Sequence, residues 1–264
     1  MNSPSIRFED GAAYEAFMGR WSRLAGERFL QFLAPEPGGH WLDVGCGNGA
    51  FTELLMQRCA PASVQGIDPS PAQIAFARQR PGTAGAVFEV GDAMALPQAD
   101  ASVDAAVMAL VIFFVPEPAR AVAEMARVLR PGGSGSAYAW DLLGGGFPFA
   151  VIQDALAELG VAPLWPPSPQ AAELQQLQAL WQQAGFVDVA TDRYEVTREF
   201  DSFEAFWQIA QSGPRLAPGL SGLGEGARQQ LQDAVRRRLP PGPGPLVVRA
   251  TAHAVRGRKP ALPA

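Results

Sequence analysis

Lysine, histidine and cysteine are scarce in this sequence of 264 residues. The only lysine is Lys259, so no other position can supply a lysine to a phosphate-binding loop, a Schiff base or a Tyr-Lys catalytic pair. Two histidines, His40 and His253, leave little for a zinc site or a histidine relay. Two cysteines, Cys46 and Cys59, are too few for a disulfide scaffold or a four-thiolate site. We therefore expect no bound metal.

Long apolar runs and an excess of positive charge are also absent. The 21 Lys and Arg against 26 Asp and Glu give a net charge of −5, which argues against a nucleic-acid partner. No stretch of 18 apolar residues occurs, and the opening segment MNSPSIRFEDG contains no apolar signal core. We expect a soluble, cytoplasmic protein with neither a nucleic-acid nor a membrane partner.

Short apolar runs alternate with helical stretches in the first half of the sequence. The apolar runs predict strands at 40–44, 64–68, 86–90, 103–111 and 135–140. Strand and helix alternating at this pace imply a parallel sheet that is covered by helices on both faces. Two later alternating stretches, 186–200 and 246–256, predict long strands that add an antiparallel edge. The predicted fold is α/β and Rossmann-like, with a seven-stranded, mostly parallel sheet and an antiparallel edge strand.

The same patterns predict four parts within one domain. Residues 1–39 form a helical N-terminal segment, and residues 40–141 form the Rossmann-like core. Residues 142–185 form a cap insertion and a helix, because glycine, proline and aromatic residues gather there. Residues 186–264 supply the strands and helices that complete the sheet.

The loop after the first strand carries the strongest chemical signal. It reads LDVGCGNGA and lies between a predicted strand and a predicted helix. Glycine lets the backbone turn sharply and approach a ligand closely, and the start of a helix offers free N–H groups. The spacing of Gly45, Gly47 and Ala50 also satisfies the dinucleotide fingerprint, so this loop alone does not choose a cofactor.

Two carboxylates follow later strands of the same predicted sheet. Asp68 ends the second strand, where a carboxylate can accept hydrogen bonds from both hydroxyls of a ribose. Asp92 ends the third strand, and its carboxylate and the adjacent N–H can recognise an adenine edge. The alternative for each position is a turn or a helix cap without a ligand.

Taken in order, four segments resemble the class I S-adenosylmethionine-dependent methyltransferases, in particular their small-molecule group. These segments are LDVGCGNGAFT, GIDPS, VGDAMALP and VDAAVMALVIFFVPEPARAVAEMARVLRPGG. The resemblance covers residues 39–141, and YEAFMGRWSR nearer the N-terminus looks like the lead-in of that group. It implies S-adenosylmethionine as the cofactor and S-adenosylhomocysteine as its product.

The resemblance also implies which residues surround the cofactor. The glycine loop with Asp43 would surround the methionine moiety, Asp68 would hold the ribose, and Asp92 would hold the adenine. The N-terminal segment would fold over the cofactor and exclude water. The complete implied set is Tyr14, Arg20, Trp21, Asp43, Gly45, Cys46, Gly47, Gly49, Asp68, Pro69, Asp92, Ala93, Ala109 and Leu110.

One segment departs from the resemblance and bears on the acceptor. Members of that group often carry histidine in the segment here written Ile112-Phe113-Phe114-Val115-Pro116, where this sequence has two phenylalanines. Apolar and aromatic linings are typical of small-molecule pockets, so we expect a small, apolar or aromatic acceptor. The predicted substrate residues are Phe114, Trp140, Phe147, Phe149 and Trp165. The alternative is that the cap aromatics only attach the insertion to the core.

The predicted function is transfer of a methyl group to a small molecule by in-line displacement, a reaction that depends mainly on alignment. No catalytic residue is assigned. Two alternatives stay open: a nicotinamide-dependent oxidoreductase on the same glycine-loop fold, and a non-catalytic cofactor-binding module. The oxidoreductase is disfavoured because an internal Tyr-Lys pair is impossible and histidine is scarce.

Overall fold

The structure is a computed structural model that describes residues 15–162, 164–211, 213, 216, 220, 222–240 and 245–261. Its strands are β1 (His40–Val44), β2 (Ser63–Asp68), β3 (Val87–Val90), β4 (Val103–Ala109), β5 (Leu129–Trp140), β6 (Val187–Phe200) and β7 (Leu246–Arg258). Its α-helices are α2 (Arg20–Leu33), α3 (Ala50–Cys59), α4 (Pro71–Gln79), α5 (Pro118–Val128), α6 (Ala150–Glu158), α7 (Leu174–Gln183), α8 (Phe203–Gln211) and α10 (Glu225–Arg238). Short helical segments are η1 (Glu15–Gly19), η2 (Pro81–Thr83), η3 (Ile112–Phe114) and η4 (Pro169–Ala172). The predicted residue Tyr14 lies outside the described residues.

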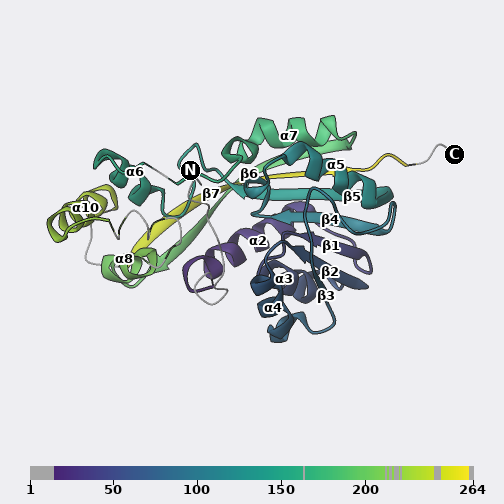
Figure 1. Cartoon of the computed structure of the whole chain (residues 1–264), viewed down its shortest axis with the longest axis horizontal. Helices are drawn as coiled ribbons and strands as arrows, with labels where there is room; N and C mark the ends of the chain where they lie inside the picture. Colours follow the sequence, from purple (N-terminus) through teal and green to yellow (C-terminus); the bar gives the residue numbers. More distant parts are fainter. Residues whose placement is uncertain are drawn as a thin grey trace.

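The strands form one sheet in the order β3-β2-β1-β4-β5-β7-β6 (Figure 1). Strands β1 to β5 pair in parallel, and β7 runs antiparallel to both of its neighbours, β5 and β6. The predicted Rossmann-like sheet, with seven mostly parallel strands and antiparallel pairing at one edge, is confirmed. The strand order reverses between β1 and β4. In open α/β sheets, ligands bind at this point, outside the carboxyl ends of the strands.

Helices cover both faces of the sheet. Helices α2, α3 and α4 lie on one face, and α5 and α7 lie on the other (Figure 1). Helix α4 begins where the sequence offers a cap, since Ser70 Oγ accepts the N–H of Gln73 (3.4 Å) and Pro71 occupies the first turn. None of the described helices combines the length and the apolar character needed to cross a lipid bilayer.

Two of the strand boundaries that differ from the expected ones have a clear cause in the backbone. Strand β4 ends at Ala109, because Leu110 adopts a left-handed backbone conformation (φ 62°) that interrupts the extended chain. Strand β5 begins at Leu129, directly after α5, instead of at residue 135. Leu129 pairs with Val103 and Ser134 pairs with Ala105, so the intervening residues bulge out of the ladder.

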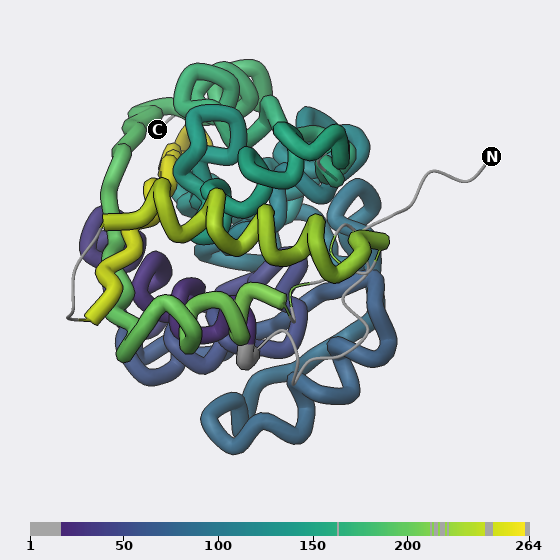
Figure 2. Tube along the Cα trace, turned by 90° about the vertical axis from the view of Figure 1, so that its left-hand side faces the viewer, coloured from purple at the N-terminus to yellow at the C-terminus, as the bar shows by residue number. Residues whose placement is uncertain are grey.

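The long strands β6 and β7 continue beyond the shorter strands and carry a group of helices at one end of the molecule. Helices α6, α8 and α10 gather there, and α8 and α10 lie side by side when this end is viewed directly (Figures 1 and 2). Arg236 of α10 donates to Glu204 of α8 (2.6 Å), and its guanidinium lies 4.2 Å from the ring centre of Phe203. An ion pair and a cation–π contact therefore join the two helices.

Two sets of contacts attach helix α2 to the sheet, one in the hydrophobic core and one at the C-terminus of the helix. The ring of Phe29 on α2 packs against Tyr138 of β5 at 4.7 Å and against Phe51 of α3 at 6.0 Å between ring centres. Arg256 of β7 donates through Nη1 to the carbonyl oxygens of Phe32 (3.0 Å) and Leu33 (3.1 Å). These carbonyls end the helix, where a cation is favourable.

Replacing Arg256 should therefore destabilise the fold. We expect Arg256→Ala to lower the free energy of unfolding by about 1–2 kcal/mol, because the last carbonyls of α2 lose a charged donor. Arg249→Ala is the matched control, since Arg249 lies on the same strand and pairs with Glu195 at the surface. An exposed pair of this kind contributes at most about 1 kcal/mol. Urea denaturation measures both variants, and equal effects would contradict the capping role.

Candidate active site

The carboxyl ends of the central strands open into a cavity of about 1190 Å³. The loop from β1 to α3 forms its floor, and three glycines of this loop have positive φ angles: 77° at Gly45, 51° at Gly47 and 80° at Gly49. A Cβ on Gly45 would lie 2.5 Å from Val111 Cγ1, so this position excludes any side chain. The loop is thus held close to the segment that follows β4, on the opposite wall.

Backbone hydrogen bonds fasten this loop to the end of β2. The N–H groups of Gly45 and Cys46 both donate to the carbonyl oxygen of Ile67, at 2.7 and 2.9 Å. The N–H of Gly47 donates to Asp68 Oδ2 (3.0 Å), and the N–H of Ser70 donates to Asp68 Oδ1 (2.9 Å). Burial raises the pKa of Asp68, and these two N–H groups counteract the rise. A carboxylate has about four acceptor positions, so two remain for the hydroxyls of a ligand.

Asp43, the fourth residue of β1, is buried beneath the same loop. Its Oδ2 accepts the hydroxyl of Thr52 (2.6 Å), whereas Oδ1 is buried and has no hydrogen-bond partner in the described structure. Burial raises the pKa of Asp43 to about 7; the Thr52 hydroxyl lowers it and the nearby Asp68 raises it further. Asp43 also lines the cavity. A donor, and above all a cationic donor, would satisfy the remaining oxygen.

The third strand contributes a short turn at the edge of the cavity. Asp92 Oδ1 accepts the N–H of Met94 (2.8 Å), and the Asp92 carbonyl accepts the N–H of Ala95 (3.0 Å). Asp92 and Ala93 both line the cavity. Asp92 therefore closes a turn and also lines the cavity. A role in the turn and a role in binding a ligand are compatible at this position.

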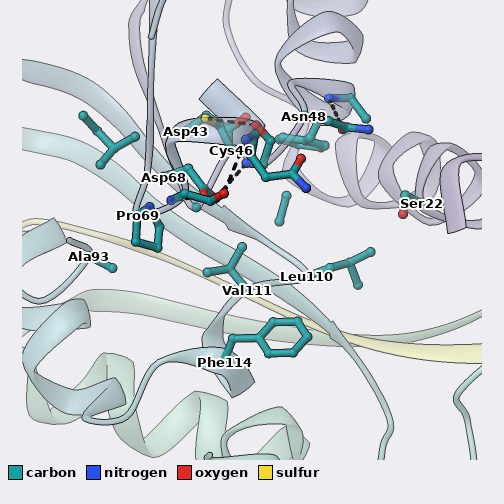
Figure 3. Close-up of a pocket in the computed structure, with 18 of the residues that line it drawn as sticks. Ser22, Asp43, Cys46, Asn48, Asp68, Pro69, Ala93, Leu110, Val111 and Phe114 are labelled. Carbon is teal, nitrogen blue, oxygen red and sulfur yellow. Dashed lines mark hydrogen bonds between the residues drawn. The ribbon is translucent and has the colours of Figure 1, made fainter. Parts of the chain in front are cut away.

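The wall opposite the glycine loop is apolar. Leu110, Val111 and Phe114 face Asp68 and Pro69 across the cavity in Figure 3. The left-handed conformation of Leu110 is held by its N–H, which donates to the carbonyl of Tyr138 (2.9 Å). The site therefore combines a polar side, made by the loops after β1, β2 and β3, with an apolar side made by the segment after β4.

Most of the residues predicted to bind the cofactor are brought together here. The predicted residues that line the cavity are Arg20, Asp43, Gly45, Cys46, Gly47, Asp68, Pro69, Asp92, Ala93, Ala109 and Leu110, together with Phe114 and Trp165 from the predicted substrate set. Gly49 and Trp21 are not among the lining residues. Gly49 ends the loop as the residue before α3, and Trp21 is fully buried with its ring edge-on to Trp140, 6.4 Å between centres.

Three aromatic residues of the predicted substrate set lie in the core and do not line the cavity. Trp140, Phe147 and Phe149 are all buried. The ring of Phe149 stacks on Phe17 at 4.5 Å and on Phe206 at 5.5 Å between centres. These rings join the insertion to the N-terminal segment and to α8, because stacking on one another removes more apolar surface from water than facing a cavity would.

Neither histidine lines the cavity. His40 lies at the opposite end of β1 and pairs with Ser63 Oγ (2.8 Å). His253 is buried within β7, and its Nδ1 donates to the carbonyl of Ala172 (2.9 Å). Within the described residues, no cluster of three or more His, Cys, Asp or Glu is placed to hold a metal ion.

Sequence reasoning missed several lining residues, of which Arg198 carries the most chemistry. Other missed residues that line the cavity are Ser22, Asn48, Gln73, Val111 and Tyr138. The signal for Arg198 was present, because Tyr194, Val196, Arg198 and Phe200 alternate along the buried face of β6. A charged residue on an otherwise apolar strand face is a candidate for a specific contact.

Fold and cavity together define a Rossmann-like protein with a large cavity at the reversal of strand order. The sequence model of the family described as Methyltransferase domain matches residues 42–136. These residues contain most of β1, all of β2 to β4, the glycine loop, Asp68 and Asp92. This part of the chain therefore has the sequence pattern and the fold of a methyltransferase domain.

Two curated relatives are similar to part of the chain. The malonyl-[acyl-carrier protein] O-methyltransferase of Methylococcus capsulatus is 37% identical over 130 residues, which cover 49% of this chain and 46% of the relative. The fatty-acid O-methyltransferase of Mycolicibacterium smegmatis is 39% identical over 92 residues, 35% of this chain and 34% of the relative. The chain thus aligns with less than half the length of either protein.

Solved structures resemble the chain over a larger share of its length. The phosphoethanolamine N-methyltransferase 2 of Haemonchus contortus, in complex with S-adenosyl-L-methionine, has a TM-score of 0.58 at 18% identity. This match covers 94% of this chain and 56% of the other. The fold of the C-terminal strands and helices is therefore shared beyond the 42–136 segment.

The raised pKa of Asp43 makes stability depend on pH in a defined direction. The unfolded side chain loses its proton near its usual pKa of 3.8, whereas the folded one keeps it up to about pH 7. Between these values the folded state binds more protons, so its stability falls as the pH rises from about 4 to 7.

We expect the asparagine variant of this position to remove that dependence. The free energy of unfolding of Asp43→Asn, minus that of the wild type, should rise by about 2–3 kcal/mol between pH 5 and pH 8. Urea denaturation at several pH values measures both free energies of unfolding. Groups that titrate equally in both proteins contribute nothing to the difference between them. A difference that stays constant with pH would mean that Asp43 is ionised throughout.

Proposed function

We propose that this protein is an enzyme that transfers a methyl group from S-adenosylmethionine to a small, apolar or aromatic acceptor. The observation that carries the proposal is the continuous cavity with one polar and one apolar side. Pockets for a single small molecule span about 300–1,000 Å³. The volume of about 1190 Å³ therefore supports a site for a cofactor and an acceptor next to each other.

The residues on the polar side fit S-adenosylmethionine in three respects. The partnerless, buried Oδ1 of Asp43 suits a cationic donor such as the ammonium group of the methionine moiety. The two open acceptor positions of Asp68 suit the two hydroxyls of a ribose. The bare backbone at Gly47, where a Cβ would meet nothing within 4 Å, leaves space for close approach.

Alignment and exclusion of water are the main contributions of this chain to the proposed reaction. S-adenosylmethionine, when bound, supplies a methyl group on a positively charged sulfur that is already activated. Holding the acceptor in line with that methyl group can contribute about 7–11 kcal/mol to catalysis. Leu110, Val111 and Phe114 would form the apolar wall that orients the acceptor and excludes water. The ring face of Phe114 would also attract the cationic sulfur by about 0.5–2 kcal/mol.

The relatives support an acceptor with an apolar body. The two relatives described above are named for a malonyl group on a carrier protein and for fatty acids, which are both acyl compounds. An acyl or aromatic body suits a wall formed by Leu110, Val111, Phe114 and the partly exposed Trp165. Mass spectrometry of the methylated products, described below, identifies the acceptor.

Cofactor binding is tested at Asp68. We expect Asp68→Ala to weaken binding of S-adenosylhomocysteine by at least about tenfold, because the ribose loses a charged acceptor. Isothermal titration calorimetry measures the affinity, and the melting temperature shows whether the variant remains folded. Asp100→Asn is the matched control. Asp100 precedes β4 at the amino ends of the strands, away from the cavity, and pairs with Arg127. A wild-type protein that binds neither S-adenosylmethionine nor S-adenosylhomocysteine would overturn the proposal.

The acceptor class is tested with a panel of small molecules. We expect release of S-adenosylhomocysteine in the presence of phenols or medium-chain acids, because the acceptor side of the cavity is apolar. Sugars and small polar amines should give no product. Mass spectrometry of the reaction mixture identifies both products at once. Methylation confined to the sugars or the polar amines would show that the apolar wall does not contact the acceptor.

A further inference from the structure

Arg198 occupies an unusual position for a charged side chain. It lies on the inner face of β6, in line with Tyr194, Val196 and Phe200, and only 9% of its surface is exposed. This face of β6 packs against α2, where Tyr194 donates its hydroxyl to the carbonyl of Ala25 (3.1 Å). Arginine is rarely buried to this degree unless an anion pairs with it.

The guanidinium of Arg198 lacks such an anion within the described structure. Its Nε and Nη1 atoms are buried and have no hydrogen-bond partner. Its guanidinium carbon lies 4.5 Å from the ring centre of Phe200. Burial, and secondarily the positive charge of Arg20, lower the pKa of Arg198. The neighbouring Glu199 lies on the opposite, exposed face of the strand.

Arg198 nevertheless lines the same cavity as the glycine loop. Strand β6 is the edge strand, four positions from β1 in the sheet order. At about 4.8 Å per strand, the backbones of β1 and β6 are roughly 19 Å apart across the sheet. Asp68 and Asp92 follow β2 and β3, on the other side of β1. Arg198 therefore lies at the end of the cavity that is remote from the proposed adenosine site.

We propose that Arg198, with the exposed Arg20 beside it, forms an anion-binding subsite that selects acceptors carrying a carboxylate. The inference rests on the proposed methyl transfer and specifies its acceptor. A guanidinium pairs with a carboxylate through two parallel hydrogen bonds, which would give a partner to one of the two partnerless nitrogen atoms, Nε or Nη1. The ring of Phe200 beside the guanidinium suits an acceptor in which a single carboxylate is attached to an apolar body. Arg198 is thus a specificity-determining residue of the acceptor site.

A carboxylate could also come from the methionine moiety of the cofactor, so the experiment separates the two sources. Calorimetry first measures S-adenosylhomocysteine binding to the full chain. The protein saturated with S-adenosylhomocysteine is then titrated with decanoate and with 1-decanol, which share an apolar chain and differ in charge. We expect the wild type to bind decanoate at least about tenfold more tightly than 1-decanol, as charged hydrogen bonds of this kind imply.

The variants assign that preference to one side chain. Arg198→Gln should abolish the preference for decanoate and leave the affinity for S-adenosylhomocysteine within about twofold of the wild type. Arg198→Lys keeps the charge without the planar fork and should keep part of the preference. Arg193→Gln is the matched control, because Arg193 lies on the same strand with its side chain exposed. Removal of a buried, unpaired charge is not expected to unfold the protein.

Each other outcome contradicts the inference in a distinct way. A wild type without preference for decanoate, including one that binds neither probe, has no such subsite. If Arg198→Gln loses S-adenosylhomocysteine affinity tenfold and keeps the decanoate preference, then the cofactor's own carboxylate is the anion. A wild type that fails to bind S-adenosylhomocysteine contradicts the proposed function itself, before the acceptor is added.

Discussion

The carbonyl oxygen of Ile67 fixes the cofactor side of the cavity. It accepts hydrogen bonds from the N–H groups of both Gly45 and Cys46, so the loop that follows β1 is attached to the C-terminal end of the neighbouring strand β2. The next residue, Asp68, reaches back to the N–H of Gly47. The position of α3 follows from this loop, since Gly49 directly precedes the helix. The carboxylate of Asp68 is therefore oriented by the protein itself, which reduces the entropy that a ligand would lose on binding.

Charge is distributed unevenly along this cavity. The buried Asp43 and the half-buried Asp68 lie near β1 and β2, and burial raises the pKa of each carboxyl group. Two arginines, Arg20 and Arg198, lie near α2 and β6. A buried group keeps its charge at low cost only when an opposite charge joins it. The cavity thus favours a cationic molecule at one end and an anionic molecule at the other, which matches the proposed pair of a sulfonium cofactor and a carboxylate acceptor.

The features that could be predicted from sequence are those that neighbouring residues determine. Positive φ angles in the glycine loop and the Ser70-Pro71 start of α4 depend on residues within a few positions, and the alternation of apolar runs gave the order of strands and helices. The bulge at the start of β5 depends on its pairing with β4, so the apolar run alone placed the strand too late. Phe149 gave no signal of its direction, because its partners Phe17 and Phe206 come from distant segments. The alternation along β6 put Arg198 on the same face as Val196 and Phe200, but only the fold shows that Arg198 borders the cavity.

The scarcity of lysine and histidine gains a specific meaning at this site. Lys259 donates to the carbonyls of Arg127 and Leu129, near the start of β5, and both histidines lie away from the cavity. An alcohol or an acidic carbon would need a base to remove its proton, and neither residue type is in place to act as one. A carboxylate is already ionised at neutral pH, because its usual pKa is about 4. An acceptor of this kind would therefore pair with the guanidinium of Arg198 without the help of a general base.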